Sequence, residues 1–115
     1  MTLQTANFNY PTLEVFRRTT NGSGIDFSMP AAAQTLNISP EHETGSMTTL
    51  TIDLELKEDN GVYRVINTGL ALAAAGVKVD VQGWGGRTVR LTSTVFTLGA
   101  VTTAVLNVTC GKISH

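Results

Sequence analysis

The strongest structural signal in this chain of 115 residues is an alternation of apolar and polar side chains between residues 47 and 58. The apolar positions are Leu50, Ile52, Leu54 and Leu56, and the polar positions between them are Thr51, Asp53, Glu55 and Lys57. Successive side chains of a β-strand point to opposite faces of a sheet. The pattern therefore predicts a long strand with one buried face and one polar face.

Turn residues divide the remaining chain into short strands. The dipeptide Asn21-Gly22 is typical of tight hairpins, and Glu58-Asp59-Asn60-Gly61 predicts another hairpin after the long strand. The expected strands cover residues 13–18, 25–29, 35–39, 47–58, 62–67, 77–82, 87–96 and 101–113. Residues 68–76 are rich in leucine and alanine, which leaves a short helix or an apolar strand open. About eight strands at this spacing predict an all-β domain, an antiparallel β-sandwich or a jelly-roll-like barrel.

The first eleven residues show no period, so we expect an extended N-terminal arm (1–11) followed by a single β domain (12–115). Leu3, Phe8 and Tyr10 are the apolar anchors of this arm. The arm could run over another surface or along its own domain.

The amino-acid composition excludes some classes of function and favours others. Hydrophobic residues make up 42% of the chain, enough for a core, whereas charged residues make up only 15%. A weakly charged, threonine-rich surface is typical of a protein that lies against neighbours. The net charge of −1 provides no basic surface for nucleic acid, and no apolar stretch is long enough to span a membrane. We expect protein partners, and synthesis in the cytoplasm because residues 1–10 do not resemble a secretion signal.

Few residues could support catalysis. Asp53 and Glu55 share one strand face about 6.5–7 Å apart, a spacing that would suit a pair of catalytic carboxylates. Their position opposite the apolar row is better explained by solvent or subunit contact. The cluster Glu41-His42-Glu43 is the one candidate for metal binding, but a metal site usually needs three or four converging ligands. We therefore expect a protein that is not an enzyme and uses no cofactor or metal.

Two further features bear on contacts. A single cysteine, Cys110, alternates with Leu106 and Val108 and is expected to be a buried thiol. Trp84 stands between glycines in a turn and is followed by Arg87. Trp and Arg are enriched where interfaces gain most of their binding energy. Trp84 could serve such a contact or fold back to close one end of the core.

Across its whole length the chain resembles the small capsid cement or decoration proteins of tailed phages: one small β domain, a threonine-rich surface of low charge and an N-terminal arm. The resemblance implies a structural protein of the virion that binds the major capsid protein and copies of itself, for example as a trimer. It would stiffen the shell. The expected contact residues are Leu3, Phe8, Tyr10, Trp84 and Arg87.

Two other functions are compatible with the same pattern. A tail or head-completion protein of the virion would have the same general character. A carbohydrate-binding or pilus-like β-sandwich module is the second alternative. Sugar binding would require Trp84 and Tyr63 to lie on one exposed face.

Overall fold

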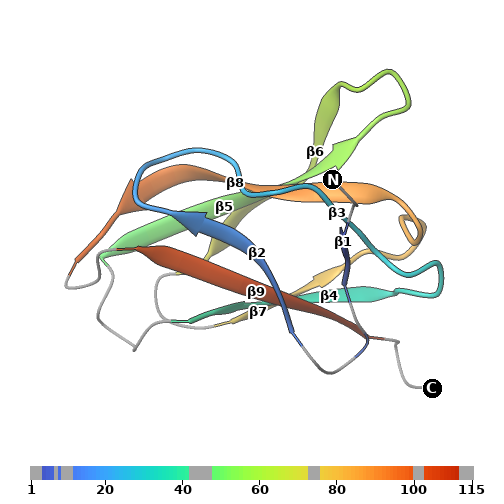
Figure 1. Ribbon diagram of the computed structural model, residues 1–115, viewed down its shortest axis with the longest axis horizontal. Coiled ribbons are helices and arrows are strands. Elements are labelled where there is room, and N and C mark those ends of the chain that lie inside the picture. The colour runs from blue at the N-terminus through green and yellow to red at the C-terminus, as the bar shows by residue number, and fades with distance from the viewer. Residues whose placement is uncertain are drawn as a thin grey trace.

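The computed structural model describes residues 4–6, 8, 12–41, 48–72, 76–99 and 103–111. These residues form nine strands and no helix, and the strands make two sheets that pack face to face (Figure 1). The expectation of an all-β sandwich is confirmed. The strands are β1 (Gln4–Thr5), β2 (Leu13–Arg18), β3 (Phe27–Ser28), β4 (Thr35–Pro40), β5 (Thr49–Lys57), β6 (Tyr63–Ala71), β7 (Val77–Asp80), β8 (Thr88–Thr97) and β9 (Ala104–Gly111).

The five-stranded sheet has the order β1-β3-β8-β5-β6, and the four-stranded sheet has the order β2-β9-β4-β7. Among these strands, only β5 and β6 follow one another within a sheet; every other connection passes from one sheet to the other. The β5–β6 hairpin projects beyond the body of the sandwich (Figure 1). It is the hairpin that the turn at residues 58–61 predicts.

The predicted alternation of β5 organises the core. All four apolar side chains of this strand are at most 1% exposed, and the polar residues between them lie on the outer face. In the antiparallel register with β8, Leu54 lies opposite Leu91 and Leu56 opposite Val89. In the four-stranded sheet, β4 places Leu36 opposite Cys110 and pairs with β9 along its length. Cys110 is buried, as expected. The largest fully buried side chains are Phe16, Phe27, Met29, Leu36, Ile38, Leu50, Ile52, Leu54, Leu56, Leu72, Leu91 and Leu106.

The hairpin predicted at Asn21-Gly22 is wrong, because β2 and β3 belong to different sheets. The Arg18 guanidinium donates to the carbonyl oxygens of Thr20 and Ser23 at 3.0 and 3.1 Å and holds the connection in a compact loop. The Gly22 amide donates to the Ser93 hydroxyl at 2.8 Å, which ties the loop to β8. These tertiary contacts override the local turn preference and carry the chain across the side of the sandwich.

The strand expected at residues 25–29 is only two residues long. Phe27 and Met29 are buried as the alternation predicts, but Ile25 is 49% exposed. The Ile25 amide donates to the carbonyl of Val15 in β2, so this part of the chain is still crossing between the sheets. In the ambiguous segment 68–76, residues 68–71 continue strand β6, and residues 73–75 lie outside the described part.

The described residues of the expected arm lie along their own domain. Strand β1 pairs in parallel with β3, and the Ala6 amide donates to the Ser28 carbonyl at 2.9 Å. Phe8 then forms a parallel bridge with Cys110 of β9. The segment thus passes from β3 at the edge region of one sheet to the C-terminal end of β9 in the other (Figure 1). Leu3 and Tyr10 lie outside the described residues.

Replacement of Leu54 by alanine should lower the free energy of unfolding by about 2–5 kcal/mol, because the side chain is fully buried at the centre of β5 and its loss leaves a cavity. Urea denaturation followed by Trp84 fluorescence measures the change. Val62→Ala is the control, because Val62 is 59% exposed and its truncation should cost at most about 0.5 kcal/mol. Equal effects of the two substitutions would contradict the assignment of β5 to the core.

Candidate interaction surface

The outer face of the five-stranded sheet carries a connected polar network. Glu55 of β5 accepts hydrogen bonds from the Arg90 guanidinium at 2.7 Å and from the Thr92 hydroxyl at 2.5 Å. The Thr92 hydroxyl also lies 2.9 Å from that of Ser23. Glu55 and Arg90 are opposite one another in the β5–β8 register, so the backbone pairing itself brings the two charges together. Their side chains are only 15% and 26% exposed.

Tyr63 extends the network toward the projecting hairpin. The Arg90 guanidinium lies 3.4 Å from the centre of the Tyr63 ring, a cation–π contact. The phenol donates to both carboxylate oxygens of Asp26, at 2.6 and 2.7 Å. The Lys57 ammonium lies 3.6 Å from the same carboxylate. Every charge in this network, Asp26, Glu55, Lys57 and Arg90, therefore has a partner of opposite sign.

The same contacts perturb the acidity of the tyrosine. The hydrogen bond to Asp26 raises the pKa of Tyr63, and burial and the negative charge of Asp26 act in the same direction. All three effects favour the neutral phenol, which can donate its hydrogen bond, over the phenolate.

The two carboxylates considered as a catalytic pair have different roles. Asp53 and Glu55 share the outer face, as predicted, and Asp53 accepts a hydrogen bond from the Gly69 amide at 3.2 Å. Gly69 has a positive φ of 70°, a backbone conformation that favours glycine. Asp53 thus secures an irregular point of the edge strand β6, while Glu55 is held in its ion pair with Arg90.

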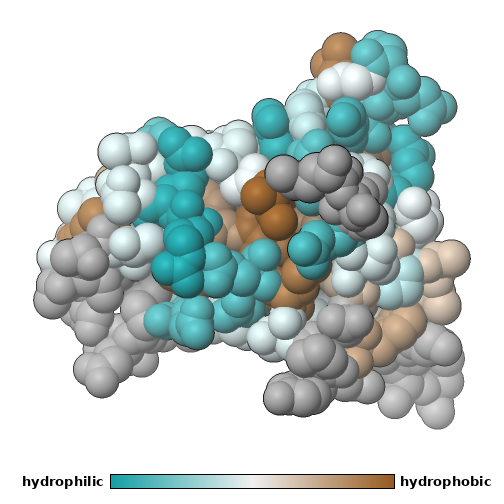
Figure 2. All heavy atoms as spheres, viewed as in Figure 1, coloured by the Kyte–Doolittle hydropathy of each residue, from teal (hydrophilic) through white to brown (hydrophobic). Residues whose placement is uncertain are grey.

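Exposed apolar side chains surround the polar network. Val65 of β6 is 42% exposed and lies opposite Glu55; Val95 of β8 is 48% exposed and lies opposite Thr51. Val62 follows the turn of the projecting hairpin and is 59% exposed. Figure 2 shows a hydrophobic residue at the tip of this hairpin, among hydrophilic neighbours. We call the outer face of the five-stranded sheet, from Val95 to Val65, the valine face.

The sequence did not identify these valines as contact residues. Valine is common on both faces of a strand, so its exposure depends on what the opposite sheet and the chain ends cover. The sequence contained one indication of an exposed valine. Val62 directly follows a polar turn and does not belong to the apolar row of β5.

The predicted contact residues Trp84 and Arg87 lie in the connection between β7 and β8. Trp84 is half-buried and packs against the core, and the Arg64 guanidinium lies 5.2 Å from the centre of its ring. The Arg87 amide donates to the Trp84 carbonyl at 3.1 Å, which closes the turn. Trp84 therefore helps to close the core, and Arg64 lies over its ring. Its role in a contact with a partner stays a prediction.

Of the remaining candidate residues, those that the structure describes do not lie together at one site. Phe8 is half-buried against the core beside Cys110, at a different part of the molecule from the valine face. Of the cluster Glu41-His42-Glu43, only Glu41 lies within the described residues, where it is exposed. In the described part of the chain, no three His, Cys, Asp or Glu side chains converge as metal ligands would.

Tyr63 and Trp84 do not form a common platform for a sugar. Neighbouring residues of a strand point to opposite faces, and Arg64, the residue after Tyr63, reaches the Trp84 ring. Tyr63 itself lies on the outer face, where Arg90 covers its ring. The two aromatic rings therefore lie on opposite sides of β6, and each already has a guanidinium as its neighbour.

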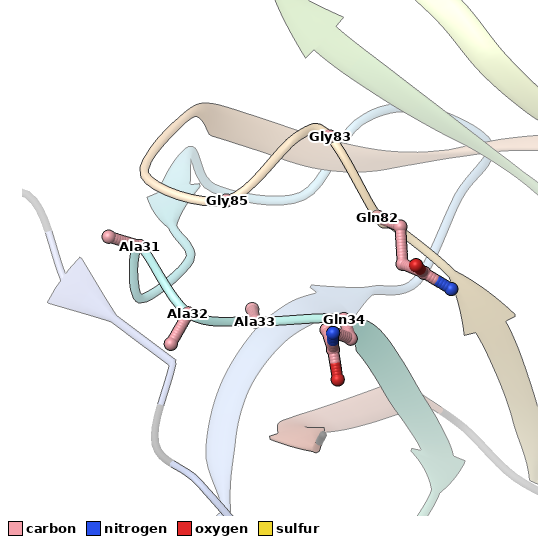
Figure 3. Close-up of a pocket in the computed structure, with 7 residues that line it drawn as sticks. All are labelled: Ala31, Ala32, Ala33, Gln34, Gln82, Gly83 and Gly85. Atoms are coloured by element: carbon pink, nitrogen blue, oxygen red, sulfur yellow. The ribbon is translucent and has the colours of Figure 1, made fainter. Parts of the chain in front are cut away.

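An open hollow of about 400 Å³ lies between the β3–β4 and β7–β8 connections (Figure 3). Three alanines line one wall and two glycines the other, with Gln34 and Gln82 toward one end. A Cβ atom on Gly85 would lie 2.2 Å from the Ala31 carbonyl oxygen, so only glycine permits this close approach. The hollow offers mainly backbone and small side chains, without a charged group among its lining residues.

Replacement of Tyr63 by phenylalanine should lower the free energy of unfolding. It should also make that free energy depend less on pH in alkaline solution. Since the folded state raises the pKa of Tyr63, the stability gained from the neutral phenol is complete below the unfolded value of about 10. It is lost as the pH rises through the higher folded value. Urea denaturation between pH 8 and pH 11 measures the profile. Identical profiles for the wild type and Tyr63→Phe would contradict the role of the Asp26 hydrogen bond.

No helix in the described residues is both long and apolar enough to cross a membrane. The chain matches no protein-family model, no curated protein and no solved structure.

Proposed function

We propose that this chain is a non-enzymatic structural subunit of a tailed-phage virion, and that it acts as a cement protein on the capsid. The observation that carries the proposal is the valine face, where exposed valines surround charges that are already paired with one another. A surface of this kind can be covered by a neighbour without leaving any of those charges unpaired, which is the main penalty of burying ionic groups.

The composition of this face also suits a protein contact. The centres of protein interfaces are depleted in charged residues, and tyrosine and arginine are enriched there. Tyr63 and Arg90 stand stacked in the middle of the face and are held by Asp26 and Glu55. Because these side chains are already fixed, binding would cost little of the entropy that ordering a flexible surface requires.

Cement activity needs no chemical step. A protein that binds the assembled lattice but not its separated subunits stabilises the lattice by mass action, by about 2.7 kcal/mol per site at a hundredfold excess over Kd. On this proposal the partners are the major capsid protein and neighbouring copies of the chain. The projecting β5–β6 hairpin would extend the valine face toward such a neighbour.

The test is binding to expanded capsids assembled from the major capsid protein of the same phage in the absence of this chain. Cosedimentation should be saturable, with a fixed number of copies per capsomer, and should raise the melting temperature of the capsid. Capsids that sediment without the chain at its highest soluble concentration would contradict the cement role. Binding to purified tails or head connectors instead would favour a tail or head-completion protein.

Replacement of Val95 by lysine should weaken lattice binding at least about tenfold, because it introduces an unpaired charge into the contact (about 1.4 kcal/mol). The free energy of unfolding should change by no more than about 0.5 kcal/mol, since Val95 is half exposed. Ser39→Lys is the control: Ser39 is also exposed but lies in β4 of the four-stranded sheet, on the other side of the sandwich from the valine face. Equal binding by both variants, or an equal loss in both, would show that the valine face is not the contact.

A further inference from the structure

The N-terminal segment, residues 4–6 and 8, makes its backbone pairings with strands that are distant in sequence. Strand β1 pairs with β3, the Ala6 amide donates to Ser28, and Phe8 bridges Cys110 of β9. The next strand in the chain, β2, pairs with β9 instead. The site that holds the segment is therefore built from β3 and β9.

This site would be costly to leave empty. Ala6 is 1% exposed and Cys110 is fully buried, and Phe8 packs against the same core. Removal of the segment would expose these apolar atoms and leave the backbone groups of two strand edges without partners. The segment is nevertheless short, with a two-residue strand and one further bridge. Its release requires the loss of few backbone pairs.

The direction of the chain changes sharply after the segment. Phe8 runs parallel to β9, whereas β2, which begins at Leu13, runs antiparallel to the same strand. The residues between them are Asn9-Tyr10-Pro11-Thr12. Only these four residues join the segment to β2. Short connections of this kind promote exchange of the segment that they carry.

We propose that the N-terminal segment exchanges between copies of this chain, so that residues 4–6 and 8 of one copy occupy the β3–β9 site of another. The occupant fits because it is the same sequence that fills the site within one chain, and every pairing is preserved. Exchange is favoured where copies are held close together, because the effective concentration of the segment is then high. The exchange would link neighbouring copies whatever the surface to which they are bound.

A disulfide trap tests the proposal. The hydroxyl oxygens of Thr5 and Ser28 lie 2.8 Å apart, so the double variant Thr5→Cys/Ser28→Cys places two thiols in contact. Copies labelled with ¹⁴N and ¹⁵N are mixed, incubated at high concentration and then oxidised. After digestion, mass spectrometry measures the mass of the peptide pair that is joined by the disulfide between residues 5 and 28. If the segment exchanges, disulfide-linked chains should appear on a non-reducing gel. With random pairing of copies, about half of the interchain disulfides should join a ¹⁴N peptide to a ¹⁵N peptide.

The matched control is Ser23→Cys/Thr92→Cys. Those hydroxyls lie 2.9 Å apart within the body of the sandwich, so this disulfide should join residues of one chain only. Cys110 should not interfere, because burial raises the pKa of its thiol to about 11, and a Cys110→Ala background checks this. Peptides of the 5–28 pair that remain isotopically pure, in chains that remain monomeric, would overturn the proposal. Lattice binding is measured separately, so either proposal can fail without the other.

Discussion

The burial of one face of β5 is the interaction on which the rest of the structure depends. Its four alternating apolar side chains are completely enclosed, with β8 and β6 on either side and the four-stranded sheet across the core. A slip of one residue would turn the whole row toward solvent and bring Asp53 and Glu55 into the core. The hydrophobic effect therefore fixes the register of the central strands as well as their presence.

That register also determines the chemistry of the outer face. Because Leu54 must lie opposite Leu91, Glu55 must lie opposite Arg90, and the ion pair follows from the packing on the other side of the sheet. Arg90 then stacks on Tyr63, and Asp26 fixes the tyrosine hydroxyl. The polar network of the valine face is consequently rigid and its four charges are paired, two properties that favour a permanent protein contact.

The two edges of the five-stranded sheet are protected from pairing with other chains in different ways. Strand β6 is an edge strand with two irregularities in its pairing with β5, and such bulges discourage uncontrolled pairing with other chains. The opposite edge is closed by the N-terminal segment, which joins β3 to β9 through a few backbone contacts. One edge of the five-stranded sheet is thus blunted by its own geometry, whereas the other is covered by a short piece of chain end.

The sequence alone determined the features that depend on neighbouring residues. The alternation around Leu54 predicted β5 and its buried side, and the turn at Asn60-Gly61 predicted the hairpin to β6, because side-chain period and turn preference are local. It also predicted that Trp84 lies in a turn, but it predicted neither the cation over the tryptophan nor the exposed valines.

Only the tertiary structure decided which sheet each strand joins. Asn21-Gly22 has the local signal of a hairpin, yet Arg18 and Ser93 hold that loop across the side of the sandwich. The place of the N-terminal segment likewise depends on the contact between Phe8 and Cys110, at opposite ends of the chain. Such contacts form only when the core brings distant residues together, so the local sequence pattern does not specify them.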